Sequence, residues 1–301
     1  MRLGGPVFGA ETQDPGALVA LHRRLGYSAA YCPQVQDAVR RQELQAAFRE
    51  ADIVLAELGA FCLNISHPDA AQQERNIQEI IRRLALAEEM GARCCVMHGG
   101  SCNGSGCVRA HPDNLTRRNI EHNVAVIQRI IDEVQPRSTK LVLETESRVL
   151  PDGPELYLEI IQAVDRPQFA AHLDPVNITL SPRRFYFSGD FIRRCFSVLG
   201  PHLVSCHAKD TNLVDHATAQ LTETWTGNGG LDYGAYLSEL SRLPQEPPLM
   251  LEHLGAAELP RALAYVFAKA DALGLSFRGA EHREPPAAGG VPAPAALWQE
   301  P

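Results

Sequence analysis

The chain has 301 residues, of which 45% are hydrophobic, so it has enough apolar material for one large globular domain. Its formal net charge of −8 argues against a surface that follows nucleic-acid phosphates, because such a surface normally carries a basic excess. No apolar run approaches the ~20 residues that cross a bilayer, and the first residues lack the apolar stretch of a secretory signal. We therefore expect a cytoplasmic protein that binds neither nucleic acid nor membranes.

In chain order, the sequence repeats a short apolar run, a polar turn and an amphipathic stretch that ends near a glycine. The first predicted helix shows the pattern: it begins at Asp14-Pro15, a cap followed by proline, and ends at Leu25-Gly26. The expected strands are 2–8, 28–32, 53–58, 94–98, 141–144, 169–173, 203–208 and 249–251. The expected helices are 14–26, 42–50, 67–91, 114–134, 154–164, 191–199, 233–243 and 257–273.

Eight strands that alternate with eight helices indicate an α/β fold, a closed parallel barrel. A doubly wound sheet would need a Gly-x-Gly-x-x-Gly turn after an early strand, and the sequence has none. The sequence therefore predicts a single (β/α)₈ TIM barrel over residues 1–275. Residues 276–301 are rich in proline, alanine and glycine, so we expect a flexible C-terminal tail there.

The eight cysteines form no Cys-x-x-Cys pair and no zinc-ribbon spacing. Cys102 and Cys107 flank a glycine-rich turn, where they could meet as a disulfide or bind a metal. For a cytoplasmic chain with this spacing we favour free thiols.

Four consecutive predicted strands end in a residue that could bind a metal: Glu144, Asp174, His207 and Glu252. The carboxyl ends of barrel strands meet at one mouth, where three carboxylates would repel one another without a cation between them. Oxygen ligands with one nitrogen favour Mn²⁺, with Mg²⁺ and Co²⁺ as alternatives. These residues therefore predict a site for one divalent metal ion. Glu146 could replace Glu144 as a ligand, because side chains two apart on a strand point the same way.

Four further residues are candidates for binding the substrate. His98 ends the strand 94–98, where it could bind substrate or act as a base, or else make a structural hydrogen bond. Lys209 lies two residues past the predicted metal-binding histidine and could neutralise an oxyanion, or else be a solvated lysine. Asn177, three residues past the predicted aspartate ligand, and Asn64, after the third predicted strand, complete the set.

The chain resembles the xylose isomerase-like superfamily of TIM barrels, the sugar phosphate isomerase and epimerase group, over about residues 1–275. The resemblance rests on Leu143-Glu144, His172–Pro175, His207–Asp210, Gly227–Tyr233 and Leu251-Glu252. It implies that Glu144, Asp174, His207 and Glu252 are the metal ligands. It also implies that the two glutamates exchange protons with a substrate carbon, as in epimerase members. His98, from its place at the end of the strand 94–98, is a third catalytic candidate.

The function that this resemblance implies is a metal-dependent isomerase or epimerase of a ketose or keto-sugar. A metal on a ketone oxygen and a neighbouring hydroxyl acidifies the carbon and stabilises an enediolate, and two carboxylates on opposite faces could then invert that carbon. If the next carbon carries a leaving group, the same enediolate expels it, so a dehydratase or lyase on a keto-inositol or 3-keto-glycoside is the alternative. The expected partner is a small sugar-like molecule, and a homodimer is an expected assembly because family barrels often pair.

Two other classes compete with this interpretation. An apurinic endonuclease would use three zinc ions to clamp a phosphodiester. The resemblance to those DNA repair enzymes breaks at Asn177, which replaces a histidine, and at Glu223–Thr226, which lacks their Asp-x-His pair. The other class is a non-catalytic barrel that binds a sugar, and the intact set of four ligand residues argues against it.

Overall fold

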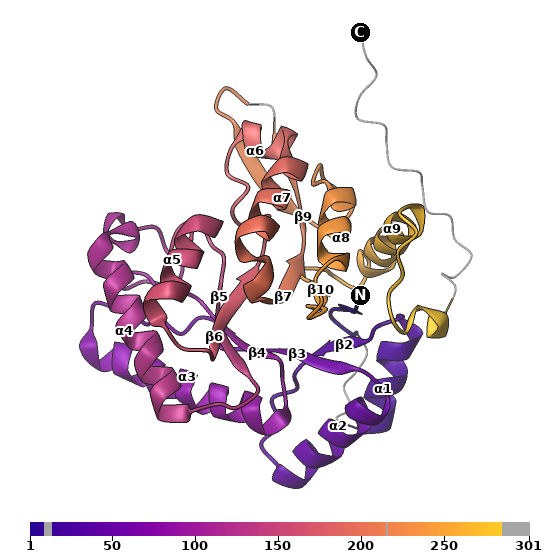
Figure 1. Cartoon of the computed structure of the whole chain (residues 1–301), viewed down its shortest axis with the longest axis horizontal. Helices are drawn as coiled ribbons and strands as arrows, with labels where there is room; N and C mark the ends of the chain where they lie inside the picture. Colours follow the sequence, from indigo (N-terminus) through magenta and orange to yellow (C-terminus); the bar gives the residue numbers. More distant parts are fainter. Residues whose placement is uncertain (9–13, 215, 285–301) are drawn as a thin grey trace.

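The computed structural model describes residues 1–8, 14–214 and 216–284, and in these residues eight parallel strands form a nearly closed barrel (Figure 1). The barrel strands are β1 (Leu3–Gly4), β2 (Ala29–Tyr31), β3 (Val54–Gly59), β4 (Cys94–Met97), β5 (Lys140–Glu144), β6 (Phe169–Leu173), β7 (Leu203–Ala208) and β10 (Leu249–Leu251). They are ordered β1-β10-β7-β6-β5-β4-β3-β2. The Ser28 N–H donates to the Leu3 carbonyl at 2.9 Å, which links the ends of this series. The predicted TIM barrel is confirmed.

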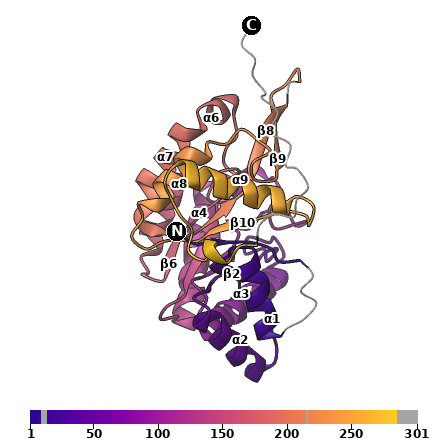
Figure 2. The ribbon, with the colours of Figure 1, turned by 90° about the vertical axis from the view of Figure 1, so that its right-hand side faces the viewer.

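Helices surround the strands on the outside of the barrel (Figures 1 and 2). They are α1 (Pro15–Arg24), α2 (Ala38–Glu50), α3 (Ala70–Met90), α4 (Arg117–Val134), α5 (Pro154–Val164), α6 (Pro182–Tyr186), α7 (Ser188–Leu199), α8 (Tyr233–Ser241) and α9 (Leu259–Ala272), with short 3₁₀ turns at Pro112–Leu115, Gly200–His202 and Ala280–His282. Capping explains several starts: Asp14, Asp37, Asp69 and Thr116 each accept a backbone N–H from the first turn of the helix that follows.

Apart from shifts of a few residues at the ends of elements, the structure differs from the predicted elements in three places. Strand β1 is shorter than the predicted strand 2–8, since Pro6 lacks the N–H that a ladder needs. Helix α6 precedes α7 and was not predicted. The chain after β7 forms an antiparallel hairpin of β8 (Asp210–Val214) and β9 (Gln220–Thr224), which was also not predicted and which projects beyond the barrel in Figures 1 and 2.

The chain that follows α9 stays attached to the barrel for part of the predicted tail. Phe277 is buried and its ring lies 5.7 Å from that of Phe267 on α9. The Arg278 N–H donates to the Met1 carbonyl at 2.9 Å. The rest of the predicted tail, residues 285–301, lies outside the described residues.

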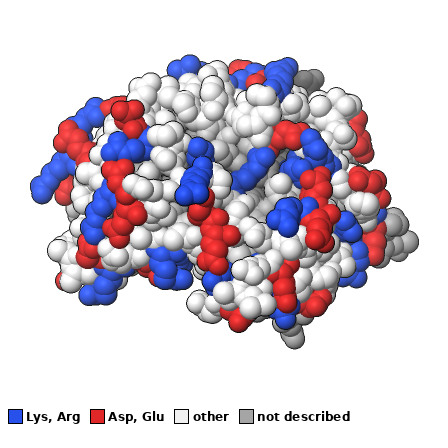
Figure 3. Space-filling model, turned by 60° about the horizontal axis from the view of Figure 1, so that its bottom comes forward, with Lys and Arg blue, Asp and Glu red and all other residues white. Residues whose placement is uncertain are grey.

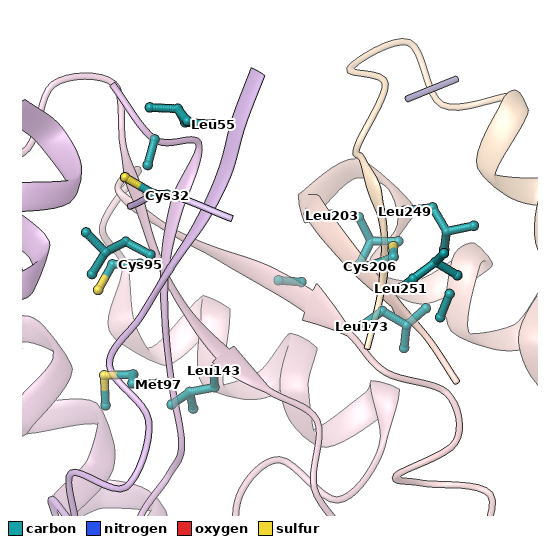
Figure 4. Close-up of a cluster of buried hydrophobic side chains, with 14 of the residues drawn as sticks. Cys32, Leu55, Cys95, Met97, Leu143, Leu173, Leu203, Cys206, Leu249 and Leu251 are labelled. Carbon is teal, nitrogen blue, oxygen red and sulfur yellow. The ribbon is translucent and has the colours of Figure 1, made fainter. Parts of the chain in front are cut away.

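The main hydrophobic core lies between the strands and the helices. Figure 4 shows part of it, with Cys95, Met97, Leu143 and Leu173 among the labelled side chains. Residues one position along the same strands form smaller separate clusters, such as Cys94, Val96, Val142 and Ala170. Because successive side chains of a strand point to opposite faces, these clusters fill the inside of the barrel. The candidate metal ligands also point into the barrel, at the ends of these strands.

On the face shown in Figure 3, lysine and arginine side chains are interspersed with aspartate and glutamate. Ion pairs among the described residues include Arg129 with Glu74 at 2.6 Å and Arg166 with Asp132 at 2.7 Å. That face therefore carries no broad patch of one charge. Of the helices in the described ranges, none combines the length and apolar character that a membrane span needs.

Candidate metal centre

Four side chains converge at the carboxyl ends of β5, β6, β7 and β10: Glu144, Asp174, His207 and Glu252. Each offers one ligand atom, and these atoms all lie within 4.8 Å of one another. His207 Nδ1 is at their centre, at 2.9 Å from Glu252 Oε2, 3.1 Å from Glu144 Oε1 and 3.8 Å from Asp174 Oδ2. The structure therefore brings together the four residues that the sequence proposed as ligands.

Hydroxyl groups from α8 and the loop before it hold the end of β7 in place. Tyr236 donates to the carbonyl of His207 at 2.8 Å, and Tyr233 donates to the carbonyl of Lys209 at 2.6 Å. Thr226 donates to the carbonyl between them, that of Ala208, at 2.8 Å. Three consecutive carbonyls of the chain that carries His207 are thus fixed by buried donors.

Asp174 is oriented by its own loop. Its Oδ1 accepts the backbone N–H of Val176 at 2.9 Å and that of Asn177 at 3.3 Å. Its backbone N–H and carbonyl both pair with the hydroxyl of Thr145 at 2.8 Å. These bonds leave Asp174 Oδ2 as the oxygen that faces the cluster.

The donor set fits a divalent cation. Asp174 Oδ2 and Glu252 Oε2 are buried and accept no hydrogen bond from the described residues, although Lys209 Nζ lies 2.9 Å and 2.8 Å from them. A buried carboxylate oxygen is costly unless a cation lies beside it, as Lys209 Nζ does here. Three carboxylates and one imidazole are ligands that Mn²⁺, Mg²⁺ or Co²⁺ accept. The cluster is therefore a candidate metal site.

The protein balances these carboxylates with its own cations. Burial raises the pKa of Glu144, but His207 and His98 together lower it by a larger amount, so its pKa lies well below the usual value. Burial likewise raises the pKa of Asp174, but the Lys209 ammonium and His207 together lower it by more, so its pKa lies below the usual value. Burial lowers the pKa of His207, whereas Glu57, Glu252 and Glu144 raise it well above its ordinary value. The carboxylates are therefore ionised and ready to bind a cation.

Of the predicted substrate-binding residues, Lys209 and Asn177 lie in the cluster. The Lys209 side chain is only 2% exposed. Asn177 donates its amide to Glu144 Oε1 at 3.0 Å, and its Oδ1 lies 3.5 Å from Lys209 Nζ. An amide N–H cannot bind a metal, so Asn177 orients the candidate ligand Glu144 in this arrangement.

His98 lies beside the cluster, with Nε2 at 3.4 Å from Glu144 Oε2. Burial lowers the pKa of His98, but contacts with the Cys107 thiol and Glu144 raise it to about 9. The ring of Phe61 lies 5.5 Å away, and His98 Nδ1 is buried with no hydrogen-bond partner in the part of the chain that the structure describes. An imidazole in this position could hold a proton next to Glu144.

Two other predicted residues are occupied elsewhere. Glu146 pairs with Arg148, whose Nε and Nη2 lie 3.0 Å and 2.9 Å from its oxygens. Glu144, and not Glu146, is thus in the cluster. Asn64 donates to the Ser101 carbonyl at 2.8 Å and accepts the N–H groups of Ser66 and Ser101. Its role in substrate binding stays a prediction.

A second group of polar side chains lies deeper in the barrel, and it was not predicted from the sequence. Glu57 of β3 accepts a hydrogen bond from His207 Nε2 at 3.0 Å and from His172 Nε2 at 3.1 Å, and it accepts the hydroxyl hydrogen of Ser205. Burial raises the pKa of Glu57, and the two histidines lower it below the usual value. The sequence does contain one sign of this group: a glutamate stands inside the apolar run 53–58. A charge buried in such a run needs polar partners elsewhere in the fold.

The sequence model of the xylose isomerase-like TIM barrel family matches residues 19–269. The chain belongs to this family. The comparison with curated proteins gives no match.

Solved structures of several enzymes have a similar fold. Endonuclease IV from Thermus thermophilus has a TM-score of 0.70 at 13% identity, over 90% of this chain and 100% of that one. D-psicose 3-epimerase from Clostridium cellulolyticum, solved with D-tagatose, has a TM-score of 0.64 at 11% identity, over 92% and 100%. The probable 3-DHS dehydratase AsbF from Bacillus anthracis has a TM-score of 0.63 at 16% identity, over 83% and 91%. At these identities the likeness shows the fold alone.

Solved structures with this fold thus include an endonuclease, an epimerase and a probable dehydratase. The activities named for these three proteins differ, so the fold does not determine the reaction. The reaction of this chain has to be argued from the residues at its own mouth.

Proposed function

We propose that this chain is a divalent-metal-dependent isomerase or epimerase of a ketose or keto-sugar. The observation that carries the proposal is that Glu144 and Glu252 approach the same atom, His207 Nδ1, from two different strands. Their strands, β5 and β10, are separated in the sheet by β6 and β7, so the carboxylates approach from two sides of the mouth. Two carboxylates around one centre suit the removal and return of a proton.

A divalent ion held by Glu144, Asp174, His207 and Glu252 would polarise a ketone oxygen and an adjacent hydroxyl, which acidifies the carbon that carries the hydroxyl. The donor set favours Mn²⁺, with Mg²⁺ and Co²⁺ as alternatives. The buried oxygens of Asp174 and Glu252, which accept no hydrogen bond from the described residues and face only charged groups such as Lys209, support this assignment.

In this proposal one glutamate removes a proton from the substrate carbon, and the other, after it has taken up a proton from its neighbour or from water, delivers that proton to the opposite face. Each has a basic neighbour: His98 Nε2 lies 3.4 Å from Glu144, and Lys209 Nζ lies 2.8 Å from Glu252. His98 would hold or donate a proton at the side of Glu144. Lys209 would face the negative charge that develops on the substrate oxygens.

The alternative within the same site is a dehydratase or lyase, in which a leaving group departs from the neighbouring carbon. The fold shared with a probable 3-DHS dehydratase keeps this reaction among the outcomes of the test. A DNA repair function is not proposed. At the position of the histidine expected for that class, Asn177 directs an amide N–H to Glu144, and the net charge is −8.

The experiment is to incubate the Mn²⁺-loaded protein in D₂O with a panel of ketoses and keto-glycosides and to analyse the products by NMR. An epimerase gives deuterium at one carbon together with inversion of that carbon. Loss of water or of an aglycone would assign the lyase reaction instead. A protein that binds metal but leaves every sugar free of deuterium and unconverted would contradict the proposal.

The matched variants are Glu252→Gln and Glu121→Gln. Glu252→Gln removes a proton acceptor at the mouth, so turnover should fall by about 10² to 10⁴, the usual contribution of general base catalysis. Glu121 is exposed on α4, and its substitution should leave turnover unchanged. Equal turnover in the wild type and Glu252→Gln would remove Glu252 from the mechanism.

A further inference from the structure

Glu57 is buried inside the barrel, one layer below the four candidate ligands. The residue is 1% exposed, and its carboxylate accepts hydrogen bonds from three side chains: His207, His172 and Ser205. An ionised carboxylate in such a place is costly unless each oxygen is satisfied. Both oxygens are satisfied here, Oε2 by His207 and Oε1 by His172 and Ser205.

The partners of Glu57 are not on the neighbouring strand. In the sheet, β3 is separated from β7 by β4, β5 and β6, so the bond from Glu57 to His207 crosses the interior of the barrel. Register pairing of adjacent strands does not require this bond. An apolar side chain would fill the same space without the cost of a buried charge. The placement of Glu57 is therefore better explained by what it does to His207.

The two nitrogens of the His207 imidazole have different surroundings. Nδ1 faces Glu144, Asp174 and Glu252, whereas Nε2 lies 3.0 Å from Glu57 Oε2. A histidine that binds a metal through one nitrogen needs a lone pair there, and donation of the other N–H to a carboxylate favours that tautomer and fixes the ring.

The inner histidine, His172, holds Glu57 in turn. Its ring meets the ring of His207 edge-on, with centroids 4.2 Å apart and an interplanar angle of 78°. Its Nδ1 is buried and has no hydrogen-bond partner among the described residues. An ionised carboxylate can only accept, so the contact with Glu57 Oε1 places the proton of His172 on Nε2 and leaves Nδ1 as the nitrogen without a proton.

We propose that Glu57 is a positioning residue for metal binding: it accepts the Nε2–H of His207 and thereby presents Nδ1 to the ion, while His172 and Ser205 hold its carboxylate. This inference rests on the proposed function, since it needs a metal at the mouth. It assigns a role to a residue that does not touch the ion or the substrate.

The test measures Mn²⁺ affinity by titration of EDTA-treated protein. Glu57→Gln keeps the shape and removes the charge, and its dissociation constant should rise about 10- to 100-fold. Ser205→Ala removes one donor to Glu57 but keeps the bond to His207, so it should lose less affinity. The matched control is Thr139→Val, which removes a buried hydrogen bond to the Ala92 carbonyl just before β5 and should bind Mn²⁺ like the wild type.

A second measurement needs only the wild type, so it holds even if Glu57→Gln does not fold. In protein with ¹⁵N-labelled histidine and bound Mg²⁺, His207 should carry its proton on Nε2 and show a downfield N–H resonance. A proton on Nδ1 would overturn the inference. So would a folded Glu57→Gln variant that binds Mn²⁺ as the wild type does. A wild type that binds no divalent ion would overturn the proposed function and this inference together.

Discussion

Lys209 Nζ lies 2.8 Å from Glu252 Oε2, and the lysine side chain is only 2% exposed. The same ammonium lies 2.9 Å from Asp174 Oδ2. It therefore neutralises part of the carboxylate charge when no metal is bound. A divalent ion among the same carboxylates would be repelled by this ammonium.

We predict that Lys209→Met increases the affinity for Mn²⁺ by at least about tenfold, because it removes a positive charge beside the ion. Turnover should fall in the same variant, since the charge that faces the substrate is lost. Thermal unfolding should show a lower Tm without metal and a larger rise in Tm on adding Mn²⁺ than in the wild type.

The control for this change is Lys140→Met at the start of β5, whose ammonium is exposed and bonds only to the Pro167 carbonyl in the described structure. It should leave Mn²⁺ affinity unchanged. Weaker Mn²⁺ binding in Lys209→Met would mean that the lysine arranges the carboxylates and does not compete with the ion.

A pH-dependent contribution to stability is predicted at Glu88 on α3. Its oxygens accept the backbone N–H groups of Arg137, Ser138 and Thr139, the last at 2.8 Å, and so tie α3 to the start of β5. Burial raises the pKa of Glu88, but these bonds to the charged form lower it below the ordinary value of 4.5. A carboxyl group whose pKa is lowered by folding stabilises the protein above its unfolded pKa and loses that effect as the pH falls through the folded pKa.

Glu88→Gln should therefore lower the free energy of unfolding by about 1 to 2 kcal/mol at pH 7. The difference should shrink as the pH falls below 4.5, the ordinary value. Urea titrations at pH 7 and at the lowest pH that keeps the wild type folded measure both quantities. The neighbouring Glu89, which pairs with Arg41 on the surface, is the control, and Glu89→Gln should cost about 0.5 kcal/mol or less. A Glu88→Gln deficit that is the same at every pH would contradict the role of the charge.

The turn after the β8–β9 hairpin depends on one buried carboxylate. Asp210 accepts the backbone N–H groups of Thr211 and Leu231 at 2.9 Å and that of Gly227 at 3.1 Å. Gly227 has a φ of 94°, which favours glycine, and a Cβ at Gly229 would collide with Asp210 Oδ1.

Asp210→Ala should lower the free energy of unfolding by about 2 to 4 kcal/mol, because it leaves three backbone donors without an acceptor. Gly229→Ala should be destabilising through the collision with the same carboxylate. Gly153→Ala has open space around the new methyl group and serves as the control for added volume, with only the smaller cost of an alanine in place of glycine at the N-cap of α5 expected. Urea unfolding of the three variants checks this prediction, and a stability of Asp210→Ala equal to that of Gly153→Ala would refute it.

The sequence was sufficient to predict the barrel and to predict which residues lie together at its mouth. Strand ends in a parallel barrel meet by geometry, so Glu144, Asp174, His207 and Glu252 could be grouped without knowledge of any contact. The sequence could not decide whether Glu144 or Glu146 joins the cluster, because side chains two residues apart on a strand point the same way. It is decided by Arg148, which engages Glu146.

The parts that were missed depend on contacts between distant segments. Glu57 lies within a strand, and its partners His172 and His207 come from 115 and 150 residues further along. A residue inside a strand is not among the polar residues that end the strands, so its position did not indicate a functional role. The β8–β9 hairpin pairs Leu213 with Leu221 in a segment where polar residues hide the strand pattern. In both cases pairing across the fold, and not local propensity, determines the structure.

The central claim is that Glu144, Asp174, His207 and Glu252 hold one divalent ion, and metal analysis of the purified protein tests it most directly. The proposal predicts one Mn²⁺ per chain after loading, with binding lost in Asp174→Asn and kept in Asp69→Asn, where asparagine can still cap α3. Three zinc ions per chain would point to the phosphodiester chemistry instead. No bound divalent ion, or equal binding by Asp174→Asn and the wild type, would contradict the claim.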